Sequence, residues 1–356
     1  KSITLSGYKL SGADAANYTV TSPTGLTANI TKADLVLDGI TAESKIYDGS
    51  KTAALTIDQL NGSNNITFTP LGNDQVTLSG GDSVSGEFAS ANAGDGVQVV
   101  LSGLSLGGND GRNYQIVTDD LTADIFKRAV SVSGASASNK TYDGTLTTTV
   151  SGGSVAGVDL DGDGTVDTAT GLVSGESLTL VDTNAIGTFA DKNVLWEVTL
   201  DSDNATVVSR AAGAKDLEVT GYTLSGATAA NYYIEQPTGL TATINAKAMT
   251  ISGITVDTRE YDGTKDATIN VSGVNYAGLV TGDDVVVTAT GAFDSANAGT
   301  QSVTLTSSYS GADVDNYTIT DQTSASGVIS QKELDISGVL ADDKVYDGNT
   351  TATFDF

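Results

Sequence analysis

The 356-residue chain contains no cysteine and no histidine, and only three prolines, one methionine and one tryptophan. Without cysteine there is no disulfide and no thiolate nucleophile, and without histidine there is no imidazole metal ligand and no Ser-His or Cys-His catalytic pair. These absences exclude most hydrolase mechanisms. A glycosidase would need two carboxylates held in one cleft, and no sequence motif identifies such a pair. We therefore expect a protein that is not an enzyme.

Positive charge is also scarce, since 17 Lys and Arg residues stand against 44 Asp and Glu residues. The resulting net charge of −27 predicts a surface that repels nucleic acid and attracts cations. No run of 18 apolar residues is present, so we expect no membrane span in this segment. No stretch shows a clean 3.6-residue apolar period, whereas Thr, Val and Gly are frequent. This pattern predicts an all-β chain with almost no helix.

A Tyr-Asp-Gly phrase recurs four times, with its tyrosines 95, 119 and 85 residues apart (142−47, 261−142, 346−261). Such intervals are long enough for each unit to bury its own core. Asp-Gly is typical of a tight turn, because the Asp side chain bonds nearby backbone and Gly adopts positive φ. We interpret the phrase as a structural repeat motif; a ligand-facing role is the alternative. Its residues are Tyr47, Asp48, Gly49, Tyr142, Asp143, Gly144, Tyr261, Asp262, Gly263, Tyr346, Asp347 and Gly348.

Other features keep a fixed distance from this motif. A period-2 apolar pair begins 12 residues before each tyrosine (47−35, 142−130, 261−249, 346−334), which predicts a half-buried strand in one register. An Asn-Tyr pair marks the far end of each unit. The last apolar residue of one unit and the first of the next are five apart, without Gly or Pro between them: Ile30 and Leu35, Ile125 and Val130, Ile244 and Met249, Ile329 and Leu334. A flexible tether would be longer and rich in Gly and Ser, so we expect semi-rigid joints.

These markers divide the chain into five segments. They are 1–32, the C-terminal half of a preceding repeat; 33–127, repeat module 1; 128–246, repeat module 2 with an acidic insertion; 247–332, repeat module 3; and 333–356, the N-terminal half of a following repeat. We predict a tandem array of β-sandwich-like modules forming an elongated rod. The expected partners are neighbouring repeats of the same long chain or sibling subunits, either of which would complete the half-repeats.

The acidic insertion of the second module reads VDLDGDGTVD. Its oxygen-bearing residues fall at positions 1, 3, 5, 7 and 9 of a loop: Asp159, Asp161, Asp163, Thr165 and Asp167. Alternate oxygens of this kind suit a hard cation with six to eight ligands, so we predict one calcium site. The EF-hand pattern is incomplete because Thr170 occupies position 12. A solvated acidic insertion is the alternative.

The only tryptophan, Trp196, alternates with polar residues in the stretch WEVTL. The alternation predicts that its indole lies on the core face of a strand and does not form a platform for a sugar ring.

Three kinds of phrase recur in the units: KIYDGS, KTYDGT and KVYDGN; LSGADAANYTV and LSGATAANYYI; FASANAG and FDSANAG. In these phrases the chain resembles the YDG and related glycine-rich, mostly β repeats of very large bacterial surface adhesins, including secreted exoproteins similar to filamentous haemagglutinin that use two-partner secretion. The resemblance covers essentially the whole chain. It implies an extracellular stalk or filament that gives reach and cohesion in cell adhesion or biofilm. It brings no catalytic residues with it.

The resemblance has two departures. Arg259 stands where the other motifs have Lys, and Leu195-Trp196 stands where a sister unit has Gly299. The second module is therefore the least typical. The alternative function is a binding module that recognises a glycan or a surface receptor through its variable loops.

Overall fold

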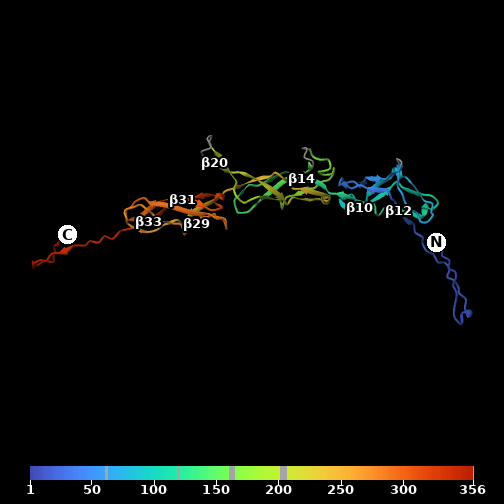
Figure 1. The fold of residues 1–356 in the computed structure, drawn as a ribbon, viewed down its shortest axis with the longest axis horizontal. Helices are drawn as coiled ribbons and strands as arrows, with labels where there is room; N and C mark the ends of the chain where they lie inside the picture. Colours follow the sequence, from blue (N-terminus) through green and yellow to red (C-terminus); the bar gives the residue numbers. More distant parts are fainter. Residues whose placement is uncertain (61–62, 119, 160–164, 201–206, 356) are drawn as a thin grey trace. The chain divides into compact units, whose positions relative to one another are not determined.

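The computed structural model describes residues 1–60, 63–118, 120–159, 165–200 and 207–355 (Figure 1). The chain is almost all β, with 46% strand and 4% helix, and its sheets are curled. The helical residues of the described part form short 3-10 turns only. None of these described helices is long and apolar enough to cross a membrane. The prediction of an almost helix-free β protein is therefore confirmed.

We use the names repeat 1, repeat 2 and repeat 3 for residues 33–127, 128–246 and 247–332; these boundaries stay sequence predictions. The elements of repeat 1 are β1 (Ala33–Val36), β2 (Ile40–Ala42), β3 (Lys45–Ile46), β4 (Thr52–Ala53), β5 (Leu55–Ile57), β6 (Gln59–Leu60), β7 (Ser63–Asn64), β8 (Thr77–Ser79), η2 (Gly81–Ser83), β9 (Ser85–Phe88), β10 (Gly94–Ser102), β11 (Ser105–Gly107), η3 (Gly111–Asn113), β12 (Tyr114–Val117) and β13 (Thr122–Phe126).

The elements of repeat 2 are β14 (Arg128–Ala137), β15 (Lys140–Thr141), β16 (Thr147–Ala156), β17 (Thr179–Val181), β18 (Ile186–Phe189), β19 (Trp196–Leu200), β20 (Val207–Ala212), β21 (Ala214–Thr220), β22 (Thr223–Ser225), η4 (Ala229–Asn231), β23 (Tyr232–Glu235) and β24 (Thr241–Asn245). Those of repeat 3 are β25 (Lys247–Ser252), β26 (Thr255–Val256), β27 (Arg259–Glu260), β28 (Ile269–Asn270), β29 (Asn275–Ala277), β30 (Val286–Phe293), β31 (Gly299–Ser310), η5 (Val314–Asn316), β32 (Tyr317–Thr320) and β33 (Ser324–Ser330).

The same strand pairing recurs in the three repeats. The opening strand pairs in parallel with the strand that starts at the Asn-Tyr tyrosine, giving β1–β12, β14–β23 and β25–β32. The short strand before Tyr-Asp-Gly pairs in parallel with the last strand, giving β3–β13, β15–β24 and β27–β33. Antiparallel pairs such as β9–β10, β18–β21 and β30–β31 fill the middle. Each repeat is therefore closed by pairing its first strands with its last ones.

Alternation along these strands builds the core. Leu35, Val130 and Met249 open the three repeats, and each is at most 1% exposed. Their side chains face inward because the parallel pairing with the Asn-Tyr strand fixes one register. The corresponding residue of segment 333–355, Leu334, is 85% exposed. In the described residues, Leu334 has no neighbouring strand that starts at the tyrosine of an Asn-Tyr pair. The opening strand alone therefore does not bury this residue.

The chain divides into two compact units. The first unit comprises Lys1–Gly134, Gly153–Asp182 and Tyr222–Gln236, and the second comprises Ala135–Gly152, Thr183–Gly221 and Pro237–Phe356. Repeat 2 is thus shared: some of its segments belong with repeat 1 and the others with repeat 3. The junction between repeats 1 and 2 lies inside the first unit, and the junction between repeats 2 and 3 lies inside the second. In Figure 1, β10 and β12 belong to the first unit and β29, β31 and β33 to the second.

Strands run almost without interruption through these junctions. A single residue separates β13 from β14, and a single residue separates β24 from β25. The apolar residues on either side are buried: Ile125 and Val130 at the first junction, Ile244 and Met249 at the second. The core cluster of repeat 1 also contains Val130 and Tyr232 of repeat 2. Repeats 1 and 2 therefore share a hydrophobic core across their junction.

Candidate functional site

The four Tyr-Asp-Gly loops have the same local structure. In each, one Asp oxygen accepts a hydrogen bond from the backbone N–H two residues later, at 2.8 to 3.1 Å, and the Gly has a φ between 77° and 82°. A basic residue three positions before the Asp forms an ion pair with it. In the third loop the Thr264 backbone N–H and the Arg259 guanidinium lower the pKa of Asp262 to about 2. The basic residue that precedes each motif thus holds the loop closed.

The tyrosines of the first two Tyr-Asp-Gly motifs, Tyr47 and Tyr142, point out of their own repeat and contact the next one. Tyr47 is 3% exposed, and its hydroxyl donates to Glu176 Oε1 at 2.5 Å. The Asn-Tyr tyrosine of repeat 2, Tyr232, donates to the other oxygen of the same carboxylate at 2.6 Å. The two rings meet edge to face with their centroids 5.5 Å apart. Glu176 therefore binds one tyrosine from each repeat.

The second junction repeats this arrangement with other residues. Tyr142, 1% exposed, donates to Asp283 Oδ2 at 2.8 Å, and Tyr317 donates to the same oxygen at 2.6 Å. The ring centroids are 5.6 Å apart, again edge to face. Here Lys192 adds an ammonium 3.0 Å from Asp283 Oδ1 and 3.1 Å from Asp313 Oδ1. Two tyrosines and one carboxylate are thus common to both junctions.

A second contact at each junction is made by the Asn of the Asn-Tyr pair. Asn231 accepts a hydrogen bond from Ala93 N at 2.9 Å and donates to Asn92 Oδ1 at 3.1 Å. At the other junction Asn316 accepts from Val194 N at 2.9 Å and donates to the side chain of Asn193 at 3.0 Å. Both asparagines are buried, at 3% and 2% exposure. A buried amide must be satisfied, so these bonds fix how one repeat meets the next.

We call each set of contacts a joint. The first joint consists of Tyr47 and Asn92–Ala93 of repeat 1 with Glu176 and Asn231–Tyr232 of repeat 2. The second consists of Tyr142, Lys192 and Asn193–Val194 of repeat 2 with Asp283 and Asn316–Tyr317 of repeat 3. The motif glycines allow the close approach, since a Cβ on Gly49 would lie 3.2 Å from a methyl of Val173, and one on Gly144 would lie 3.0 Å from a methyl of Val280.

Comparison with known families agrees with the recurring motif. The YDG domain model matches residues 31–123 and 245–325. A YDG domain is found in this chain. The matched stretches include the Tyr-Asp-Gly and Asn-Tyr pairs of repeats 1 and 3, and they leave most of repeat 2 outside. No curated protein matches the chain.

The carboxylates of the joints were not predicted from the sequence. Glu176 and Asp283 end the stretches VSGE and VTGD, and repeat 1 has LGND at the equivalent place, ending at Asp74. In all three, the backbone N–H of the first residue donates to the Asn-Tyr hydroxyl, at 2.8 to 3.0 Å. An apolar residue three positions before an acid, with a Gly between them, stands at this place in each repeat, and this recurrence is the signal that could have located them.

The electrostatics of the joints favour ionised acids and protonated tyrosines. Burial raises the pKa of the Glu176 carboxyl, but the hydroxyls of Tyr232, Tyr47 and Thr228 outweigh this effect and hold the pKa below its usual value. Asp283 behaves in the same way, with Tyr317 as its strongest donor. Burial and the neighbouring Glu176 carboxylate raise the pKa of Tyr232 to about 12.

These shifts predict a pH window for stability. The lowered carboxyl pKa values contribute stability above about pH 4, and this contribution is lost as the pH falls through the folded-state pKa. The raised tyrosine pKa values contribute stability below about pH 10, which is lost as the pH rises toward 12 for Tyr232. We expect the melting temperature to be highest between these limits and to fall on both sides. Calorimetry at a series of pH values measures the melting temperature, with Glu176→Gln as the control. If the melting temperatures of both proteins fell equally toward acid pH, the prediction would be contradicted.

The expected place of Trp196 on a core face is wrong. The residue is half-buried at the start of β19, and Val198, on the same face of the strand, is 48% exposed. The indole N–H donates to the backbone carbonyl of Asp315 at 2.8 Å. β19 pairs antiparallel with β20, and this hydrogen bond connects β19 to the Asn-Tyr turn of repeat 3. Trp196 therefore reinforces the joint, which the local alternation alone did not reveal.

The predicted calcium ligands Asp161 and Asp163 lie outside the described residues. The base of their loop is described. Asp167 N donates to the Val158 carbonyl at 2.9 Å, and the buried Thr170 hydroxyl accepts from Val158 N at 2.8 Å. These two hydrogen bonds bring the ends of the loop together beside Asp159. The calcium site itself stays a prediction. Among the described residues, no group of three or more acidic side chains is placed to hold a metal.

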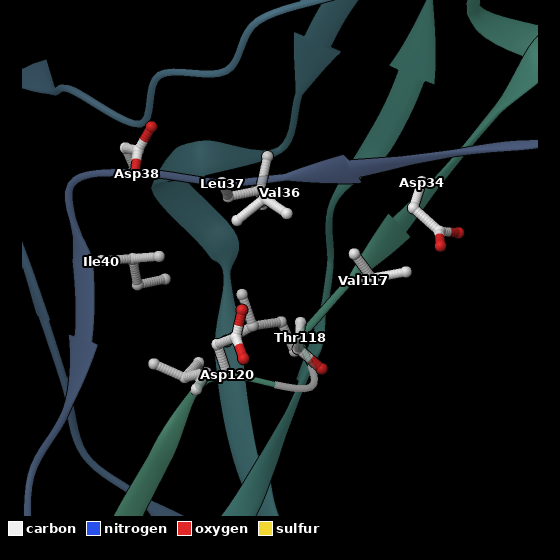
Figure 2. A pocket seen from close by; sticks show the side chains of 10 residues that line it. Asp34, Val36, Leu37, Asp38, Ile40, Val117, Thr118 and Asp120 are labelled. Atoms are coloured by element: carbon white, nitrogen blue, oxygen red, sulfur yellow. The ribbon is translucent and has the colours of Figure 1, made fainter.

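Repeat 1 also has a pocket of about 550 Å³ beside the ends of β1 and β12. Figure 2 shows Asp34 and Asp38 at opposite ends of this pocket. Asp34 accepts a hydrogen bond from Gln115 at 2.7 Å, and the lining includes no aromatic side chain. A third acid, Asp120, also lines the pocket, which offers no aromatic surface for stacking a sugar.

Proposed function

We propose that this chain is a segment of an extracellular stalk or filament of a large secreted bacterial adhesin of the filamentous-haemagglutinin-like kind exported by two-partner secretion. In this proposal the repeats are β-sandwich-like modules arranged as an elongated rod. Their role is to give reach and cohesion in surface attachment or biofilm, and it involves no catalysis. The partners are neighbouring repeats of the same long chain.

The repeated joint carries this proposal. Both junctions combine a one-residue link between strands with two buried side-chain contacts. A flexible linker would instead be long and rich in Gly and Ser. Joints of this kind resist bending at each junction, which is what a load-carrying stalk needs. The strongly acidic surface and the absence of cysteine are compatible with an extracellular place.

Small-angle X-ray scattering tests the rod. We expect the chain to have a maximum dimension above about 100 Å, because three modules of strands rising about 3.4 Å per residue would lie in line. A single globule of this length would have a radius of gyration near roughly 20 Å. A measured value close to that of the globule would contradict the proposal. Binding of the isolated chain on a glycan array would instead support the alternative of a recognition module.

We also propose that calcium binds the Asp159 to Asp167 loop of repeat 2. Isolated loops of this kind in extracellular modules bind calcium weakly, with a dissociation constant of about 10⁻⁴ to 10⁻³ M. Calcium at ten times that constant would stabilise the folded protein by about 1.4 kcal/mol. Calorimetric titration and melting with calcium or chelator measure the effect. The matched control changes Asp161 and Asp163 to Asn; an equal calcium shift in both proteins would assign it to general charge screening.

A further inference from the structure

The pocket beside the ends of β1 and β12 in repeat 1, which we call the β1–β12 pocket, has an apolar floor (Figure 2). Val36 and Val117 are register partners at the ends of these two strands, and Val36 is 53% exposed. Leu37 is half-buried, whereas its equivalents Val132 and Ile251 are 8% and 2% exposed. Repeat 1 therefore exposes apolar surface at a place where repeats 2 and 3 cover it.

Strand pairing within the repeats accounts for this difference. In repeat 3 the opening strand β25 has a partner on each side, β32 and β29, and Ile251 lies opposite Tyr276 of β29. In repeat 1 the opening strand β1 pairs with β12 alone among the described strands. The lining of the β1–β12 pocket includes no aromatic side chain. Leu37 thus lacks the aromatic neighbour that its equivalent has in repeat 3.

A preceding repeat does not cover these positions. Thr250 and Thr320 of repeat 3 correspond to Val36 and Val117 and form the same register pair. Both threonines are exposed, although the whole of repeat 2 precedes them. The exposure of the β1–β12 pocket is therefore a property of repeat 1 itself, and the valines there stand in place of threonines.

Three carboxylates line the same pocket, those of Asp34, Asp38 and Asp120, and no Lys or Arg is among its ten lining residues. Asp34 and Asp38 stand at opposite ends of the pocket (Figure 2). Their four-residue separation spans at most about 14 Å of extended chain. In the described part of the chain, no group of three acidic side chains is placed to hold a metal. The pocket therefore presents separated negative charges with an apolar surface between them.

We propose that the β1–β12 pocket binds a linear aliphatic polyamine. The two terminal ammonium groups pair with Asp34 and Asp38, and an inner ammonium group pairs with Asp120. The methylene groups between them cover Val36 and Val117. Each ion pair at a surface is weak, so burial of the methylene groups on apolar surface contributes as well.

The separation of the charges selects this class of ligand. A metal ion or a single lysine side chain has one positive centre, and it would leave at least one end of the pocket without a counter-charge. A neutral apolar molecule would leave all three carboxylates without one. The inference goes beyond the proposed function, because a structural stalk needs no small-molecule ligand.

Isothermal titration calorimetry of the full chain with spermidine tests the proposal. At 0.15 M ionic strength the charges are screened over about 8 Å, which weakens attraction to the general charge of −27. We expect one spermidine bound per chain, with shifted methyl resonances of Val36, Leu37, Val117 and Leu121. We also expect 1,8-diaminooctane to bind about two- to fivefold more tightly than 1-aminooctane, because the second ammonium adds one exposed ion pair.

Variants separate the pocket from the general charge. Asp34→Asn combined with Asp38→Asn should weaken spermidine binding about tenfold, since two exposed ion pairs are lost. The control combines Asp342→Asn with Asp343→Asn, which removes two carboxylates at exposed positions outside the three repeats, and it should leave the affinity unchanged. Val36→Thr gives repeat 1 the residue of repeat 3, and it should weaken binding about two- to fivefold through lost apolar contact. Thermal melting checks that each variant folds.

Three results would overturn the proposal: no binding of spermidine, equal affinity of the two double variants, or unshifted methyl resonances in the pocket. If the pocket double variant does not fold, Val36→Thr and the two eight-carbon amines decide, and equal affinities in both comparisons overturn it. Occupation of the pocket by a lysine-rich peptide but not by spermidine would also overturn it, because the ligand would then be a protein segment. None of these results bears on whether the chain is a stalk, which scattering tests separately.

Discussion

Replacing Tyr47 with Ala is expected to lower the stability of the first unit by about 3–5 kcal/mol, as for other buried aromatic residues. The side chain is 3% exposed, packs edge to face on Tyr232 and donates to Glu176. Its removal leaves a cavity between two repeats and takes one donor from a partly buried carboxylate. For a unit of this size the melting temperature should fall by roughly 6–20 °C. Calorimetry with hydrogen exchange of peptides from each unit locates the loss in the first unit.

The matched control is Tyr261→Ala, the same residue of the same motif without a filled joint. Its ring is 40% exposed, and we expect a loss below about 1 kcal/mol. Tyr47→Phe keeps the ring and removes only the hydroxyl bond to Glu176, so about 1–2 kcal/mol is expected. If Tyr261→Ala proved as damaging as Tyr47→Ala, the tyrosine would act within its own repeat and not between repeats.

Replacing Asp283 with Ala is expected to cost the second unit about 3–5 kcal/mol, the range for removing one member of a buried charged network. The Asp283 side chain is 2% exposed and accepts from Tyr142, Tyr317 and Lys192. Without it, two hydroxyls and an ammonium lose their common acceptor. Denaturation by urea measures the change, and hydrogen exchange should show increased opening in peptides that contain Tyr142 and Tyr317.

Asp74→Ala is the matched control for this change. Asp74 holds the same position in repeat 1, where it accepts from Tyr114 at 2.7 Å and lines a pocket of about 520 Å³. Water can replace the lost acceptor there, so we expect about 1 kcal/mol. Equal losses for Asp74→Ala and Asp283→Ala would mean that the carboxylate supports only the tyrosine of its own repeat, and the account of the joint would be wrong.

Local patterns were sufficient for the features that depend on near neighbours. The all-β character follows from the residue composition and the missing helical period. The turn at Gly49 and its equivalents follows from Asp-Gly chemistry, because the Asp bonds backbone two residues away. The inward register of Leu35, Val130 and Met249 follows from alternation at a constant offset. Each of these depends on interactions within about a dozen residues, which a sequence pattern records directly.

The chemistry of the joints was decided by the tertiary structure. Tyr47 and Glu176 are 129 residues apart, and Tyr142 and Asp283 are 141 apart. The sequence by itself marked the tyrosines, since they recur at a constant offset from a strand, but it did not show which acid each one meets. Asn113 and Asn231 have the same Asn-Tyr pattern, yet one is exposed and the other buried. Burial at these positions depends on whether another repeat covers them, and only the packing of one folded repeat against the next determines that.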